Sequence, residues 1–463
     1  MSDGGSSGSE PADVSRAATG DGPGEPSGPA HGLGESDRAR GRREIGLGIV
    51  LLCLAGTLVL GFSAKASCAS GQWSDGRQYR WLCYSDIVPL LGTEQLATGD
   101  RIPYLDPCRV EVGTSCDEYP VLTMATMRVA AWMSPLSGSP PARSYTGFFA
   151  ANAVLLAIAG AVSAVALYVM VGRRALYFAL APTLLIYGFM NWDLLAVAFA
   201  TLATLAYLRR RDVASGVLLA LGAAAKMFPG HLAVPFVLGR VHERRRVGAV
   251  RLAWAAAITW LALNVPFAVF GRSGWWEFFR LNSQRPPDWD SLWFMACQRL
   301  PGARSVCTHT WLVNLSSLVA FVVLSVLVWR LRARRQPDFA RWTFGFPLLV
   351  LFLVTNKVYS PQYGLWLLPW FALVLPDLRR FLAFEAADVA VFVTRFAFFG
   401  RLDPHIGGWV NAFTIGWFQI ALLLRLAALV WCLVGWVRAA PNLAPEVGSA
   451  RPPPVADLVW APT

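Results

Sequence analysis

Long runs of apolar residues alternate with short polar segments over residues 45–437 of the chain. A helix needs roughly 20 such residues to cross a bilayer core about 30 Å thick, and most of the runs approach that length. The pattern predicts an all-α, polytopic membrane protein with about twelve spans. The predicted spans are residues 45–63, 147–171, 175–190, 193–208, 213–240, 250–271, 311–329, 342–355, 361–376, 381–400 and 410–437.

The run at 213–240 differs from the others because Lys226, Pro229 and Gly230 interrupt it. Proline ends or kinks a helix, and a charged side chain is costly at membrane depth. We therefore predict two short helices that meet near Lys226, on the outer side of the membrane.

The polar interval 64–146 is the longest between two predicted spans. A connection of this length usually has structure and function of its own. Helices are predicted within it at 85–98 and 120–133, and the second has one apolar side that would lie along the membrane surface. This interval is predicted to be an extracytoplasmic catalytic loop.

The two ends of the chain have a different composition. Residues 1–44 are mostly Gly, Ser, Pro and charged residues, and residues 438–463 are rich in proline. Such segments bury too little apolar surface to offset their ordering entropy. We predict two disordered cytoplasmic tails around one transmembrane domain, residues 45–437.

The distribution of charge predicts how the chain is oriented in the membrane. The chain is 55% hydrophobic and 15% charged, a composition too apolar for a soluble protein of this length, and its net charge is +12. The arginines stand in short clusters between spans, without interleaved aromatic residues, which argues against a nucleic-acid partner. Cytoplasmic loops collect positive charge, so we expect both termini in the cytoplasm of a plasma-membrane protein. The clusters include residues 38–43, 173–174, 209–211, 244–246, 330–335 and 379–380.

Cysteine placement agrees with that orientation. Six of the eight cysteines fall in segments predicted to lie outside, where disulfides persist. Pairing between neighbours would join Cys68 to Cys83, Cys108 to Cys116 and Cys297 to Cys307. Six cysteines allow about fifteen connectivities, and unpaired thiols are the other interpretation.

Several polar side chains are predicted at the outer ends of spans. Charged groups at membrane depth usually face a cavity, a partner or the interface, although lysine can also snorkel to the interface. The acidic residues have no compact ligand spacing, so we expect no metal and no other cofactor. The polar residues are Asp86, Glu118, Asn191, Asp193, Lys226, His231, Arg280, Lys357, Tyr359 and Gln362.

Five segments of the chain resemble a known family. NWDLLAVAFATLATLAYLRRRDVASGVLLALGAAAKMFPGHLAVP at 191–235 resembles the core of glycosyltransferase family 87, actinobacterial membrane enzymes of the GT-C fold that use polyprenyl-phosphate sugars. SDI at 85–87, PY at 103–104 and EYPVLT at 118–123 resemble the first outer loop of that family. NKVYSPQYGLWLLP at 356–369 resembles a late motif. The resemblance extends over roughly residues 45–437.

The resemblance implies an inverting transfer on the outer face of the plasma membrane, from a polyprenyl-phosphate sugar to a lipid-anchored glycan or glycolipid of the cell envelope. Mannose is the favoured sugar and arabinofuranose the alternative, because mannosyltransferase members have a histidine-containing segment where this chain has VYSPQYG. Membrane lipids would surround the enzyme and admit both substrates.

The resemblance also implies roles for single residues. Asp86 matches the aspartate that acts as general base on the acceptor hydroxyl, a group that is a poor nucleophile until its proton is removed. Lys226, Lys357 and Arg280 would stabilise the departing lipid phosphate, with His231 a weaker candidate. Asp193 would bind the acceptor or orient Lys226.

Other interpretations of these residues remain open. Asp106 is a rival carboxylate in the same loop, and Glu118 could simply begin the helix at Pro120. A different class, a transporter or lipid flippase, is suggested by the interrupted run at 213–240 and by three charged residues on one face of a span. These are Glu385, Asp388 and Arg395.

Overall fold

The structure is a computed structural model that describes residues 31–69, 73–98, 101–108, 116–137 and 142–439. Five helical segments in this part of the chain are long and apolar enough to cross a membrane. The prediction of an all-α, polytopic membrane protein is therefore confirmed, and the number of spans stays a prediction. The five segments are Glu44–Ala66, Tyr145–Ala179, Arg246–Phe270, Thr310–Arg335 and Ile415–Arg438.

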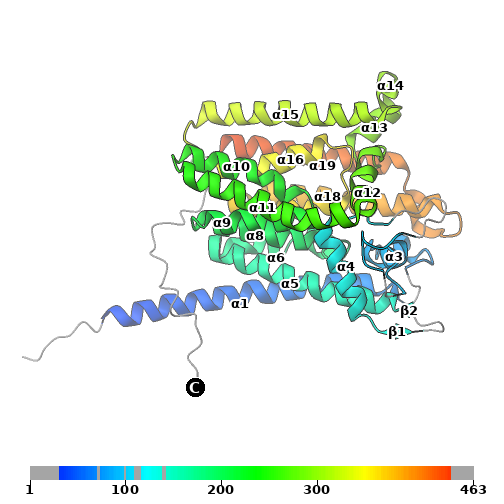
Figure 1. Cartoon of the computed structure of the whole chain (residues 1–463), viewed down its shortest axis with the longest axis horizontal. Helices are drawn as coiled ribbons and strands as arrows, with labels where there is room; N and C mark the ends of the chain where they lie inside the picture. Colours follow the sequence, from blue (N-terminus) through cyan, green and yellow to red (C-terminus); the bar gives the residue numbers. More distant parts are fainter. Residues whose placement is uncertain (1–30, 70–72, 99–100, 109–115, 138–141, 440–463) are drawn as a thin grey trace, which may run out of the picture. The chain divides into compact units, whose positions relative to one another are not determined.

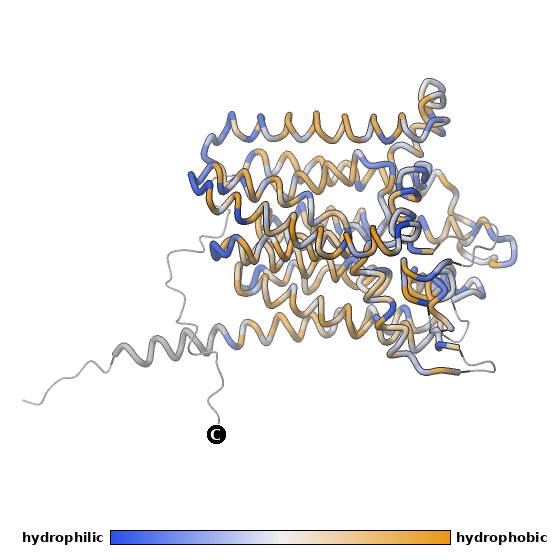
Figure 2. The backbone as a smooth tube through the Cα atoms, viewed as in Figure 1, coloured by the Kyte–Doolittle hydropathy of each residue, from blue (hydrophilic) through white to orange (hydrophobic). Residues whose placement is uncertain are grey.

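Long and short helices lie side by side through the body of the molecule (Figure 1). Their apolar residues occupy the middle of the helices and the polar residues gather at the ends (Figure 2). This distribution suits a bilayer, which solvates the middle and leaves the ends in water. The helices are α1 (His31–Ala66), α5 (Tyr145–Val171), α6 (Leu176–Ala179), α7 (Pro182–Tyr187), α8 (Asp193–Leu208), α9 (Asp212–Ala225), α10 (Phe228–His242), α11 (Arg246–Phe270), α15 (Thr310–Arg335), α16 (Gly345–Thr355), α17 (Leu368–Val374), α18 (Leu378–Leu402) and α19 (Ile415–Arg438).

The interrupted run is two helices, as predicted. α9 ends at Ala225 and α10 begins at Phe228, with Pro229 in its first turn, where a missing N–H has no helical partner to lose. The backbone at Lys226 is extended, so the helix is broken there. This break gives Lys226 a position at the end of both helices.

Shorter elements gather at one end of these helices (Figure 1). Two of them match the helices predicted in the long loop, although α3 is shorter than residues 85–98. In the described residues strand structure is limited to one two-residue pair. The elements are α2 (Arg77–Arg80), α3 (Ile87–Thr93), α4 (Val121–Met133), β1 (Leu136–Ser137), β2 (Ala142–Arg143), α12 (Arg272–Gln284), α13 (Leu292–Arg299) and α14 (Arg304–Cys307).

Disulfides tie this end together. Cys68 is bonded to Cys83, Cys108 to Cys116 and Cys297 to Cys307, which is the neighbour pairing. The first closes the segment directly before α3, and the third closes the segment between α13 and α15.

The chain ends differ in part from the prediction of tails at 1–44 and 438–463. α1 begins at His31, so the arginine-rich segment before the first apolar run continues the helix rather than preceding it. Residues 1–30 and 440–463 lie outside the described part of the chain.

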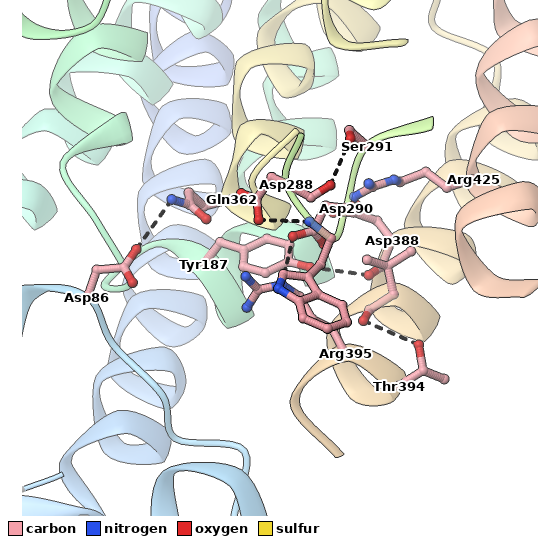
Figure 3. A network of polar contacts seen from close by, with 12 residues as sticks. Asp86, Tyr187, Asp288, Asp290, Ser291, Gln362, Asp388, Thr394, Arg395 and Arg425 are labelled. Carbon is pink, nitrogen blue, oxygen red and sulfur yellow. Dashed lines mark hydrogen bonds and ion pairs between the residues drawn. The ribbon is translucent and has the colours of Figure 1, made fainter. Parts of the chain in front are cut away.

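The charged residues of α18 have separate partners instead of forming one set. Glu385 accepts a hydrogen bond from the Thr183 N–H at 2.7 Å, and Asp388 is paired with Arg425 of α19 at 3.2 Å. Arg395, nearer the end of the helix, is paired with Asp290 at 2.8 Å (Figure 3). The first two contacts hold α18 to the other helices.

We expect Arg425→Leu to lower the free energy of unfolding by about 3–5 kcal/mol, because it leaves the buried Asp388 carboxylate without its counter-charge. Arg425 also lies 3.7 Å over the ring of Tyr359, and a leucine cannot make this cation–π interaction. Unfolding of the purified protein in detergent measures the effect. The matched control is Arg280→Leu, which removes an exposed arginine; equal stability of the two variants would contradict this account.

Candidate active site

One cavity of about 1080 Å³ is lined by residues of the short helices α3 and α12 and by residues that adjoin the longer helices. Asp86, Lys226 and Lys357 all line it, although they are far apart in the sequence. Its wall comes from residues of segments 84–93, 118–120, 190–191, 226–228, 278–288 and 352–366, together with Asn314 and Arg395. The fold therefore brings together a carboxylate and two lysines that the sequence singled out.

Asp86 is held from several sides. It is the N-cap residue of α3, and its own N–H donates to the Met190 carbonyl at 2.9 Å. Its Oδ2 accepts a hydrogen bond from Asn191 Nδ2 at 3.0 Å. The same oxygen accepts one from Gln362 Nε2 at 3.4 Å (Figure 3). Lys65, the third lysine, is buried behind it and donates to the Tyr84 carbonyl at 2.6 Å. The carboxylate is thus fixed in place and still faces the cavity.

The Lys226 ammonium lies between two side chains, that of Asn191 just before α8 and that of Asp193 in the first turn of α8. Its Nζ donates to Asn191 Oδ1 at 3.0 Å and lies 3.3 Å from Asp193 Oδ2. Asp193 is fully buried and also accepts a hydrogen bond from Trp366 Nε1 at 2.7 Å. Asp193 does not line the cavity, so its contacts favour orienting Lys226 over binding an acceptor.

Lys357 has a different environment. Its Nζ donates to two backbone carbonyls, Ser283 at 3.2 Å and Arg285 at 2.6 Å. Among the described residues no carboxylate lies within ion-pair distance of it. Burial, and then the nearby Arg285 guanidinium, lower the pKa of Lys357 to about 8. This ammonium is available to an anionic ligand.

Two more arginines line the cavity: Arg285, which the sequence analysis did not select, and Arg395, which it named as one of three charged residues on one face of a span. Arg285 follows α12 and is paired with Asp288 at 3.0 Å, while Arg395 is paired with Asp290. Burial raises the pKa of Asp290 despite that partner. The run RPPD after an aromatic helix was the available signal for Arg285, since the prolines end α12 and turn the chain toward the cavity.

Three predicted site residues lie outside the cavity wall. Arg280 is on the exposed side of α12 and is paired with Glu277 at 2.5 Å. Phe278 lines the cavity, and a residue two positions further along a helix points to the opposite side. His231 packs against Phe352, with 4.6 Å between the two ring centroids. Tyr359 lies beneath Arg425, away from the cavity. Arg285, five positions after Arg280, does line the cavity.

Glu118 does line the cavity, and its position depends on a buried carboxylate that the sequence did not reveal. Glu94 accepts hydrogen bonds from the backbone N–H groups of Asp117 at 2.6 Å and Glu118 at 3.2 Å. Asp117 is paired in turn with Arg101 at 2.6 Å. Burial raises the pKa of Glu94 to about 8, and burial also raises the pKa of Glu118.

The raised pKa of Glu94 predicts a pH-dependent stability. The folded state holds this proton more tightly than the unfolded state, so stability falls as the pH rises from about 4.5 to about 8. The slope is at most about 1.4 kcal/mol per pH unit for one group. Glu94→Gln should flatten this part of the curve, as measured by melting temperature against pH in detergent. An unchanged slope in Glu94→Gln would show that other groups cause it.

In chemical terms the cavity offers the carboxylates of Asp86, Glu118 and Asp288, of which Asp86 is oriented by two amide donors and can accept a proton, and several cations that can stabilise an anion. In the described part of the chain no three His, Cys, Asp or Glu side chains are grouped so that they could hold a metal ion.

Comparison with known proteins gives the family. The profile described as glycosyltransferase family 87 matches residues 119–361, just over half of the chain. A crystal structure of ArnT from Cupriavidus metallidurans bound to undecaprenyl phosphate is similar at a TM-score of 0.37 and 14% identity, over 84% of this chain and 78% of that one. No curated protein sequence matches the chain. The extent of the profile match shows that this chain belongs to glycosyltransferase family 87.

Proposed function

We propose that this glycosyltransferase moves a sugar, mannose in the first instance, from a polyprenyl-phosphate carrier to a hydroxyl of a lipid-anchored glycan or glycolipid of the cell envelope. The observation that carries the proposal is the cavity that Asp86, Lys226 and Lys357 share. Membership of the family supplies the reaction class, and the cavity supplies groups suited to it.

Asp86 would act as the general base. In an inverting transfer the acceptor oxygen attacks the anomeric carbon from the face opposite the phosphate, while the carboxylate takes the hydroxyl proton. One carbon–oxygen bond forms to the acceptor and one breaks to the phosphate, which leaves as the lipid monophosphate. The hydrogen bonds from Asn191 and Gln362 to Oδ2 support this role by orienting the carboxylate.

The cations would receive the departing phosphate. Lys357 is the strongest candidate because its ammonium contacts carbonyl oxygens and no carboxylate among the described residues. Arg285 adjoins it, and Lys226 lines the same cavity. Fixed cations in a partly desolvated site stabilise charge that develops in the transition state.

The position of the cavity favours an extracytoplasmic reaction. It lies at the end of α9 and α10 that contains Lys226, whereas the arginines at 209–211 and 244–246 lie at the opposite ends of these helices and their neighbours. By the positive-inside rule the arginine end is cytoplasmic. Nucleotide sugars are absent outside the cell, so a lipid-linked donor fits this side. Met227, Phe228 and Phe352 give the wall apolar surface suited to a lipid.

The proposal is tested with protein purified into nanodiscs and given radiolabelled polyprenyl-phosphate mannose, polyprenyl-phosphate arabinofuranose or a nucleotide sugar, each with an envelope lipid extract. Transfer from a polyprenyl donor supports the proposal, and the better donor identifies the sugar. Transfer from the nucleotide sugar alone would overturn it. Movement of lipid across the bilayer without a new glycosidic bond would support a flippase instead.

A further inference from the structure

We propose that Asn191 is a positioning residue that joins Lys226 to Asp86 and keeps the Asp86 carboxylate correctly oriented for catalysis. The inference deepens the proposed function and rests on the role of Asp86 as base. It assigns Asn191 no contact with substrate; the residue acts through Asp86.

Both ends of the Asn191 amide have specific partners. Its Oδ1 accepts hydrogen bonds from Lys226 Nζ at 3.0 Å and from the Trp192 N–H at 2.7 Å. Its Nδ2 donates to Asp86 Oδ2 at 3.0 Å and to the Tyr119 hydroxyl at 2.7 Å. The side chain is buried, with 2% of its surface exposed. Four contacts therefore fill the amide.

The chemistry of the partners fixes which way the amide points. An ammonium group can only donate, so the amide oxygen must face Lys226. The NH₂ group must then face Asp86, which as a carboxylate can only accept. A flipped amide would place its oxygen against the carboxylate and its hydrogens against the ammonium, with both contacts repulsive. Lys226 thus sets the orientation of Asn191, and Asn191 sets that of Asp86.

This arrangement acts on the base in two ways. A hydrogen bond to the ionised form of a carboxyl group favours that form, and a cation behind the amide strengthens the donor. Gln362 Nε2 donates to the same oxygen, Oδ2, so the two amides hold one side of the carboxylate. Asp86 Oδ1 makes neither of these two contacts, so it is the oxygen that an incoming hydroxyl would meet.

Other charged and titratable groups near Asp86 must be kept constant in any test. They come from α1, from the segments before α3 and α4, from α8 and from α18. They include Lys65, Tyr79, Tyr84, Glu118, Tyr119, Asp193 and Arg395. A substitution at Asn191 leaves all of these residues in place but removes the hydrogen bonds that its amide makes with Tyr119 and Lys226.

The test compares Asn191→Asp and Asn191→Ala with the wild-type enzyme across pH, using polyprenyl-phosphate mannose and an envelope lipid acceptor. Asn191→Asp adds a like charge and removes the donor, so the acid limb of kcat should move up by about one to two pH units. Asn191→Ala removes the hydrogen-bond donor to Asp86 but adds no charge, so it should move the acid limb less. In both variants the KM for the donor should stay within about threefold of wild type, because the phosphate-binding lysine at 357 is untouched.

The matched control is Asn282→Asp, which adds the same charge to the same cavity wall without touching Asp86. Asn282 is exposed and its Nδ2 donates to the Phe278 carbonyl. Because Asn282 lines the cavity, the KM for the donor can change in this variant, but the acid limb of kcat should keep its wild-type position. An equal shift in Asn282→Asp would overturn the inference, because a general charge effect would then explain both variants.

A double-mutant cycle separates positioning from a structural role. If Asn191 acts through Asp86, Asn191→Ala should cause no further loss of kcat in the Asp86→Asn background. Equal losses in both backgrounds would refute the inference. If Asp86→Asn alone leaves transfer intact, the proposed function fails first. If Asp86→Asn abolishes transfer but Asn191 variants keep the wild-type acid limb, only the inference fails.

Discussion

Asp86→Asn should lower kcat about 10²–10⁴-fold, the range that a positioned general base contributes. The substitution keeps the size of the side chain and its place at the start of α3, so the fold should be retained. An amide cannot take the acceptor proton, and therefore the loss should fall on kcat and not on the KM for the donor. Steady-state transfer in nanodiscs measures it.

The matched control for this prediction is Asp106→Asn, because Asp106 is the other carboxylate of the same loop that the sequence left as a rival. The structure places Asp106 outside the cavity wall, where its Oδ2 accepts a hydrogen bond from the Ile102 N–H. Asp106→Asn keeps an oxygen for that contact and should leave kcat within about twofold. A large loss of kcat in Asp106→Asn, with Asp86→Asn still active, would mean that Asp106 and not Asp86 is the general base.

Lys357→Met should lower kcat/KM for the donor about 10²-fold, comparable with removal of one donor from a site that stabilises transition-state charge. Methionine has a similar length but no charge, so the packing between Ser283 and Arg285 should be largely retained. The lowered pKa, about 8, adds a pH effect. The ammonium loses its proton above that value, so the KM for the donor should rise there in the wild type.

Lys357→Arg and Arg280→Gln give this prediction its controls. An arginine at 357 stays charged above pH 8, so the alkaline rise of the KM should disappear. Arg280 is paired with Glu277 on the exposed side of α12, so Arg280→Gln should change the KM by less than about twofold. A strong effect of Arg280→Gln with a weak effect of Lys357→Met would mean that the phosphate binds Arg280 and not Lys357.

The fold followed from sequence wherever a local pattern was sufficient. Apolar length predicts the long helices, and Lys226 with Pro229 predicts the break between α9 and α10. Amphipathic spacing predicts α4. The start of α1 was not predictable in this way. The polar segment before the first apolar run has the same apolar pattern whether it is helical or not.

The site was predictable only for residues that stand out from an apolar background. Asp86, Lys226 and Lys357 do so, and the cavity brings them together. Arg280 and Arg285 are five positions apart at the end of one helix, and only the geometry of α12 decides which faces inward. Glu94 gave no signal, since its contacts are backbone N–H groups more than twenty residues away.

A cryo-EM structure of Asp86→Asn in nanodiscs with polyprenyl-phosphate mannose tests the central claim most directly. The account predicts the donor phosphate within about 4 Å of the Lys357 ammonium and the anomeric carbon facing the side chain of residue 86. It would be contradicted by a phosphate bound at the arginine end of the helices, near residues 209–211, with the cavity lacking density for the sugar.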